Sequence, residues 1–229
     1  MKKCLLLGLT LALPMSSHAA VIENFDSYVL GSNLHGQDSW QGWGNDPAAG
    51  AFVSDTYAYS GTQTVNITGG SDLVRTFSGV ASGQWSVSVM QYIPTTSTGS
   101  SYVILLNKYI GGYSWSVQIV SNMLDGTVTS EALGGGATLP MVKDAWAEYR
   151  FDIDLTASTV SEYYNNQLLS THAWHDGNGL NELQALDLYA NGADPVYYDD
   201  VSVTAVPEPA TFTVLALGSL GLLRRRRQP

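Results

Sequence analysis

The feature that most constrains this chain is a strict two-residue alternation of apolar and polar side chains. In the stretch AEYRFDIDL, Tyr149, Phe151, Ile153 and Leu155 share one parity, and charged residues occupy the other. Because successive side chains of a strand point to opposite faces, this pattern predicts a β-strand with one buried and one wet face. We find no ten-residue amphipathic helix in the middle of the chain, so helical folds are disfavoured there.

The same alternation recurs along the middle of the chain, between breaks rich in glycine. The predicted inward sets are Trp85, Val87 and Val89; Trp115, Val117 and Ile119; and Tyr197, Asp199, Val201 and Val203. The run SYVILLN is apolar on both faces, as in a central strand, and TVSEYYNNQLLST predicts a hairpin that turns at Asn165 and Asn166. For residues 21–205 we therefore predict an all-β domain, a two-sheet antiparallel jelly-roll sandwich.

The first twenty residues, MKKCLLLGLTLALPMSSHAA, have the three parts of a secretory signal peptide. Two lysines precede a short apolar run, and small residues follow it, so we expect cleavage after Ala19 or Ala20. Cys4 is the only cysteine and would be removed with the signal. The exported domain would then depend on its core for stability, with no disulfide.

The last residues, 206–229, contain an uncharged run at 211–223 followed by Arg224, Arg225, Arg226 and Arg227. A helix of this length rises about 20 Å, which is short for the roughly 30 Å hydrocarbon layer, but long arginine stems extend its reach. Clustered arginines beside an apolar segment stay in the cytoplasm. We expect a short transmembrane helix with the domain outside the cell, in agreement with the signal peptide.

The order of Pro207, Glu208 and Pro209, an apolar segment and an arginine cluster resembles the PEP-CTERM sorting signal. That resemblance implies a Gram-negative bacterium that exports the chain through its secretion machinery. It also implies a transient anchor in the inner membrane, processing by an exosortase, and a final place on the cell surface or in the extracellular matrix. A C-terminal apolar signal of this kind is an address and does not report what the domain does.

Two stretches of the middle also resemble known sandwiches. KDAWAEYRFDIDLTASTVSEYYNNQLL is similar to the concanavalin A-like (laminin-G-like) fold. ENFDSYVLGSNLHGQDSWQGW and the closing YYDDVSV resemble the first and last strands of bacterial jelly-roll carbohydrate-binding modules. In those modules acids of the two end strands hold a structural Ca²⁺. The matching residues here are Asp26 and Asp199, with Glu23 and Asp200 as possible further ligands.

The charge of the domain also bears on its partners. Residues 21–205 hold nineteen acidic residues and only four basic ones, which excludes nucleic acid as an expected partner. Acidity is compatible with calcium, which takes six to eight oxygen ligands. The prediction that Asp199 shares a face with Val201 adds weight, because an inward carboxylate must be paired or bound to a metal. The alternative is that it accepts hydrogen bonds from backbone amides.

Aromatic residues in apparent loops suggest a platform for an extracellular polysaccharide, because flat rings stack on pyranose faces. The alternative for each ring is packing in the core. The candidates are Trp40, Trp43, Tyr113 and Trp174, with Tyr57, Tyr59, Tyr109 and His175 as further members of the set.

We find no catalytic motif. The acids Glu148, Asp152 and Asp154 alternate on one strand face, but their spacing differs from that of glycosidases on this fold, so a solvated face is expected. His172 and His175 are interpreted as surface-loop residues. The predicted function is a non-catalytic, lectin-like carbohydrate-binding module. The alternatives are a structural matrix protein without a ligand and, less favoured, a glycoside hydrolase or polysaccharide lyase.

Overall fold

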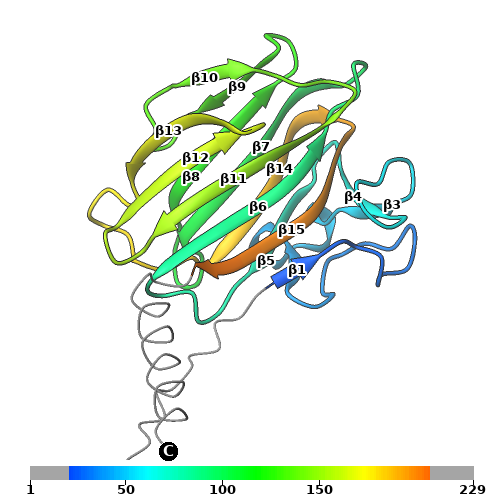
Figure 1. Ribbon diagram of the computed structural model, residues 1–229. Coiled ribbons are helices and arrows are strands. Elements are labelled where there is room, and N and C mark those ends of the chain that lie inside the picture. The colour runs from blue at the N-terminus through cyan, green and yellow to red at the C-terminus, as the bar shows by residue number, and fades with distance from the viewer. Residues whose placement is uncertain (1–20, 207–229) are drawn as a thin grey trace, which may run out of the picture.

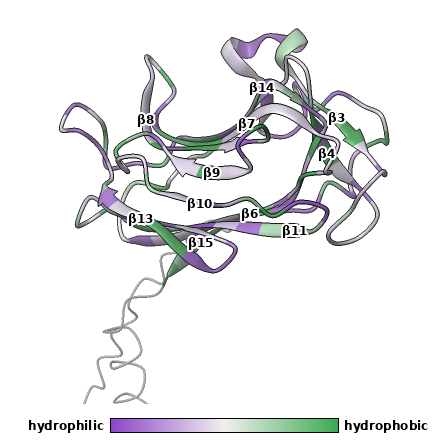
Figure 2. Cartoon of the chain, turned by 90° about the horizontal axis from the view of Figure 1, so that it is seen from above, coloured by the Kyte–Doolittle hydropathy of each residue, from purple (hydrophilic) through white to green (hydrophobic). Residues whose placement is uncertain are grey.

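A computed structural model describes residues 21–206, and they form two antiparallel β-sheets packed face to face (Figure 1). No α-helix occurs within this range, so the prediction of an all-β sandwich is confirmed. Figure 2 shows the two layers edge-on, with the seven-stranded sheet above the eight-stranded one. Two short 3₁₀ turns, η1 (Trp43–Asn45) and η2 (Pro47–Ala49), follow the strand at one edge of the upper layer.

The eight-stranded sheet has β1 (Val21–Glu23) paired with β15 and otherwise runs in the order β13 (Gln167–Ala173), β12 (Thr159–Tyr164), β11 (Trp146–Asp154), β6 (Gln84–Tyr92), β15 (Val196–Val206), β4 (Thr64–Ile67), β3 (Phe52–Ser54). The seven-stranded sheet runs in the order β10 (Thr138–Pro140), β9 (Thr127–Ser130), β8 (Ser114–Asn122), β7 (Thr98–Lys108), β14 (Ala185–Asp194), β5 (Asp72–Thr76), β2 (Trp40–Gly42). The pairings of β15 with β1, β4 and β6, and of β14 with β5 and β7, join strands that are distant in sequence, which ties the two ends of the domain together.

The alternation in β11 is confirmed, because Tyr149, Phe151 and Ile153 are buried between the sheets while Asp152 is exposed. The same alternation, predicted for β6, is also present there. β7 is a central strand buried on both faces. The hairpin between β12 and β13 turns at Asn165 and Asn166, both with positive φ, as expected for asparagines in such a turn.

Trp115 does not point inward, contrary to the sequence prediction. The pairing of β7 with β8 shifts register twice, and Trp115 comes to lie opposite Leu106 while Val117 lies opposite Leu105. A shift of one residue moves side chains to the other face of a sheet. Val117 and Ile119 enter the core, but Trp115 is 41% exposed on the outer face.

A second irregularity corrects the prediction for Asp199. The β15–β6 register shifts between Asp199 and Ser202, and Asp200 has a positive φ of 45°. Consequently Val201 and Val203 belong to the core between the sheets, whereas Asp199 lies opposite Met90 on the other face. Asp199 is nevertheless fully buried, because the loop that contains Tyr59 and Ser60 covers it.

The predicted signal peptide with its expected cleavage at Ala19 or Ala20, the Pro-Glu-Pro stretch, the predicted transmembrane run and the four arginines lie outside the described residues. Within residues 21–206, the structure contains no helix that is long and apolar enough to cross a membrane.

Candidate functional site

The outer face of the seven-stranded sheet is apolar, although an outer face ordinarily meets water. Val74, Ile104, Leu106, Tyr109 and Ala185 form a second buried cluster there, separate from the core between the sheets. They come from β5, β7, the turn after β7, and β14. Such a cluster on the outside of a sandwich needs a cover, and aromatic side chains supply part of it.

Four aromatic rings gather over this face. The Trp43 ring centroid is 4.7 Å from that of Tyr113, 5.3 Å from that of Tyr109 and 6.3 Å from that of Trp115, and the Trp43 and Trp115 planes differ by only 16°. Tyr113 is 50% exposed and Trp115 41% exposed. These rings therefore present flat apolar surface to solvent.

The turn η1 is held over the sheet by specific contacts. The hydroxyl of Tyr109 accepts hydrogen bonds from the Gln41 side-chain amide, at 3.0 Å, and from the Gly44 backbone N–H, at 3.3 Å. Gly44 has a φ of 63°, a left-handed conformation that glycine adopts without a Cβ clash. The turn thus places Trp43 against Tyr109, which fixes one wall of the site.

Two open hollows adjoin this aromatic group and share Trp115 and Gln118. The larger, of about 450 Å³, lies near the turn after β7, and the smaller, of about 290 Å³, lies over the middle of the sheet. The larger is lined by Lys108, Tyr113, Ser114, Trp115, Gln118, Ala132, Leu133, Asp176 and Asn178. The smaller is lined by Trp43, Asp72, Tyr102, Ile104, Trp115, Gln118, Asp187 and Tyr189.

Two carboxyl groups, Asp72 and Asp187, line the smaller hollow. Asp187 lies opposite Val74, and Asp72 lies opposite Tyr189, so the two acids are diagonal neighbours on adjacent strands and within reach of each other. Burial, together with the nearby charge of Asp72, raises the pKa of Asp187 well above its usual range. Burial also raises the pKa of Asp72, while its hydrogen bond with Asp187 opposes that rise. Asp187 is therefore the member of the pair that keeps a proton longer as the pH rises.

Two of the four aromatic residues predicted for a sugar platform cannot serve as one. Trp40 and Trp174 are 1% and 0% exposed. The Trp40 ring packs on Phe25 and under the Arg75 guanidinium, and the Trp174 indole N–H donates to the Glu182 carbonyl. The other two, Trp43 and Tyr113, do come together at the site.

The sequence analysis missed Trp115, Asp72 and Asp187. The register shift that turns Trp115 outward cannot be predicted from the alternating sequence of its own strand. Asp187, however, interrupts the apolar run ALDLYA, and a lone acid in such a run is a usable signal.

The acids on β11 lie on the outer face of the other sheet. Asp154 accepts from the Gln84 amide and the Ala157 N–H, and Asp152 contacts Arg150 and Ser86. This is the solvated face that the sequence predicts.

His172 does not lie in a loop. It belongs to β13, and its Nε2 is 2.9 Å from the buried Glu162 carboxylate.

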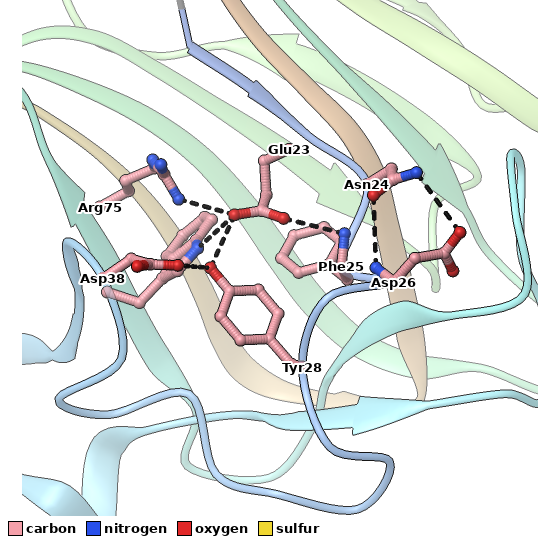
Figure 3. A network of polar contacts seen from close by, with 8 residues as sticks. Glu23, Asn24, Phe25, Asp26, Tyr28, Asp38 and Arg75 are labelled. Carbon is pink, nitrogen blue, oxygen red and sulfur yellow. Dashed lines mark hydrogen bonds and ion pairs between the residues drawn. The ribbon is translucent and has the colours of Figure 1, made fainter.

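Glu23, a predicted calcium ligand, is saturated by protein donors (Figure 3). Its carboxylate accepts from the Arg75 guanidinium at 2.9 Å, the Tyr28 hydroxyl at 2.7 Å, the Phe25 N–H at 2.9 Å and the Trp40 indole at 3.4 Å. A carboxylate with so many donors has little capacity for a cation. It fastens the end of β1 to β5 and β2 instead.

The remaining predicted calcium ligands, Asp26, Asp199 and Asp200, do not fit the ion. Asp26 accepts the backbone N–H groups of residues 62 and 63, and Asp199 accepts those of residues 59, 60 and 200. Amide hydrogens that point at a carboxylate would repel a cation there, and Asp200 accepts from the Ser60 hydroxyl. Among residues 21–206, no three acidic or histidine side chains gather as a metal site. The backbone-amide alternative therefore describes Asp199.

Comparison with known families supports the interpretation of the C-terminus. Residues 205–227 match the model of the PEP-CTERM protein-sorting motif. The chain carries a PEP-CTERM sorting signal. The motif implies export in a Gram-negative bacterium, membrane-anchored sorting and processing by an exosortase. A search of curated proteins finds no match.

Solved structures share the fold at low identity. A sialidase matches with a TM-score of 0.58 and 10% identity over 82% of this chain and 18% of its own. The Trypanosoma cruzi calreticulin globular domain matches with a TM-score of 0.51 and 11% identity, over 85% of this chain and 90% of its own. An endo-β-1,4-glucuronan lyase from the fungus Trichoderma reesei has the same score and identity, over 82% and 95%. The chain thus spans only a small part of the sialidase, and these likenesses show the fold alone.

Proposed function

We propose that this exported, exosortase-sorted protein is a non-catalytic carbohydrate-binding module with a jelly-roll fold, and that its binding surface is the outer face of the seven-stranded sheet. The observation that carries the proposal is the group of Trp43, Tyr109, Tyr113 and Trp115 beside two open hollows. Rings that are half exposed and held by neighbouring rings lose little freedom when a pyranose stacks on them. An extracellular polysaccharide is the ligand that an exported protein meets.

The geometry favours binding over hydrolysis. Glycosidases separate their two carboxyl groups by roughly 5–5.5 Å or 6.5–9.5 Å, so that one attacks or activates water while the other gives a proton. Asp72 and Asp187 instead lie on adjacent strands as diagonal neighbours, and the mutual influence on their pKa values is that of carboxyl groups in close contact. The fungal lyase and the sialidase share only the fold, and fold does not determine activity.

The test is retention of the purified full chain on a panel of polysaccharides, compared with two tryptophan variants. We expect W115A to weaken binding at least about tenfold, a loss of about 1.4 kcal/mol, because it removes a flat wall shared by both hollows. The matched control is W146A, since Trp146 lies among Tyr59 and Tyr92 at the eight-stranded sheet. It should leave binding unchanged within about twofold.

Three results would overturn the proposal. The first is that the wild-type chain retains no glycan at all, which would favour a structural matrix protein. The second is equal weakening by W115A and W146A in folded variants. The third is the release of new sugar ends from the polysaccharide, which would show an enzyme.

A further inference from the structure

The Asp72–Asp187 pair differs from the other buried acids because no protein group donates to it. Within residues 21–206, no group outside the pair donates a hydrogen bond to either side chain, and the Oδ1 atoms of both are buried without a partner. Asp187 is only 2% exposed. A buried carboxyl without donors loses its hydration with no replacement, and this is costly unless a ligand compensates.

No positive side chain offsets this pair. The hollow over it is lined by aromatic, aliphatic, amide and acidic side chains and by no lysine, arginine or histidine. Of the four basic residues in the described range, Arg75 pairs with Glu23, Arg150 with Asp152, and Lys143 binds the Met123 carbonyl. Lys108 lines the neighbouring hollow instead. A pair in which only Asp187 keeps a proton therefore retains one uncompensated negative charge.

The walls of the hollow suit a cation as well. Trp43 and Trp115 lie nearly parallel at its side, and Tyr102 and Tyr189 lie together with ring centroids 5.6 Å apart. The faces of such rings attract an ammonium group by about 0.5–2 kcal/mol. Aromatic faces beside a half-buried negative charge that receives no hydrogen bond from outside the pair can bind a protonated amine carried by a sugar ring.

We infer that the ligand of this face is a glycan whose sugars carry free, protonated amino groups. The ammonium group donates to the Asp72–Asp187 pair while the sugar ring stacks on Trp115 or Trp43. A neutral sugar offers only hydroxyl donors, and an acidic sugar brings a second negative charge to an acidic hollow, so both bind more weakly. This inference rests on the proposed function and specifies its ligand class.

The experiment compares three oligosaccharides of equal length on the full chain by calorimetry. They are an oligomer of glucosamine, its N-acetylated form and an oligomer of glucuronic acid. At about pH 6 primary amines are protonated. We expect the glucosamine oligomer to bind at least about tenfold more tightly than the acetylated form, to weaken when salt is added, and the glucuronic acid oligomer to bind least.

The double variant D72N/D187N keeps the shape of the pair and removes its charge. We expect it to abolish the preference for the amine, so that the glucosamine oligomer and its acetylated form bind within about threefold of each other. The single variant D72N, which leaves a neutral Asp187, should act in the same direction. D152N is the matched control, because Asp152 is an exposed acid on the other sheet, and it should leave the preference intact.

The outcomes separate the two proposals. Equal or tighter binding of the acetylated oligomer, tight binding of the uronate, or a preference that survives in D72N/D187N overturns the amine inference and leaves the binding face standing. If no oligosaccharide binds the wild-type chain, the proposed function fails and the inference fails with it.

Discussion

Two buried acidic sites in this molecule have opposite surroundings. Glu23 receives hydrogen bonds from four protein groups and is paired with the Arg75 guanidinium (Figure 3). The Asp72–Asp187 pair receives none from outside the pair, and burial raises the pKa of Asp187 well above its usual range. The comparison separates an acid that stabilises the fold from an acid pair that can still accept hydrogen bonds from a ligand. Saturation by donors, rather than burial alone, distinguishes the two roles.

The largest expected effect concerns the saturated site. R75A leaves Glu23 buried without its cation, and breaking a buried pair in this way costs about 3–5 kcal/mol of unfolding free energy. R150A removes a partly exposed pair with Asp152 and a ring contact with Tyr163, for which about 1 kcal/mol is expected. Urea unfolding measures both. Equal losses in the two variants would show that the Glu23 network does not fasten the fold.

For the Asp72–Asp187 pair we expect substitution to raise the stability, in contrast to the loss expected for R75A. A raised carboxyl pKa means that the folded state binds protons more strongly than the unfolded chain. Stability from Asp187 is therefore full below the ordinary aspartate pKa of about 3.9 and is lost as the pH rises through the raised value. D187N, which is neutral at every pH, should gain about 1–2 kcal/mol at neutral pH.

The pH dependence supplies the control for that variant. Its advantage over the wild type should shrink as the pH falls toward the ordinary aspartate range, because the wild-type pair then becomes neutral as well. Thermal unfolding between about pH 4 and pH 8 measures the gap. A gap that is constant with pH, or a D187N that is less stable at neutral pH, would refute the raised pKa of Asp187.

The smallest expected effect is that of metal removal. Asp26 and Asp199 already accept backbone amides, so a chelator should leave the melting temperature unchanged within about 1 °C. Added calcium should do the same. A clear fall on chelation, restored by calcium, would mean that these carboxylates exchange their amide partners for the ion.

The alternating pattern identified the sandwich because period two and burial coincide in β6 and β11, where no residue interrupts the pairing. The same reasoning misplaced Trp115 and Asp199. Each lies beside a register shift, and a bulge is a property of two paired strands that one strand's sequence does not contain.

The candidate site was only partly predictable for a related reason. Trp43 and Tyr113 were identified as aromatic loop residues, but Trp40 and Trp174 have the same local appearance and are buried. What distinguishes them is a long-range contact, such as that of Trp40 with Arg75. The acid pair likewise arises from diagonal positions on β5 and β14, which are far apart in sequence.

The most direct test of the central claim follows the indole signals of the six tryptophans by NMR, assigned from single substitutions, while a bound glycan is titrated. The account predicts that Trp43 and Trp115 shift with the ligand, whereas Trp146 at the other sheet and the buried Trp40, Trp85 and Trp174 remain in place. Movement of Trp146 with an unchanged Trp115 would place the ligand on the opposite sheet and contradict the account.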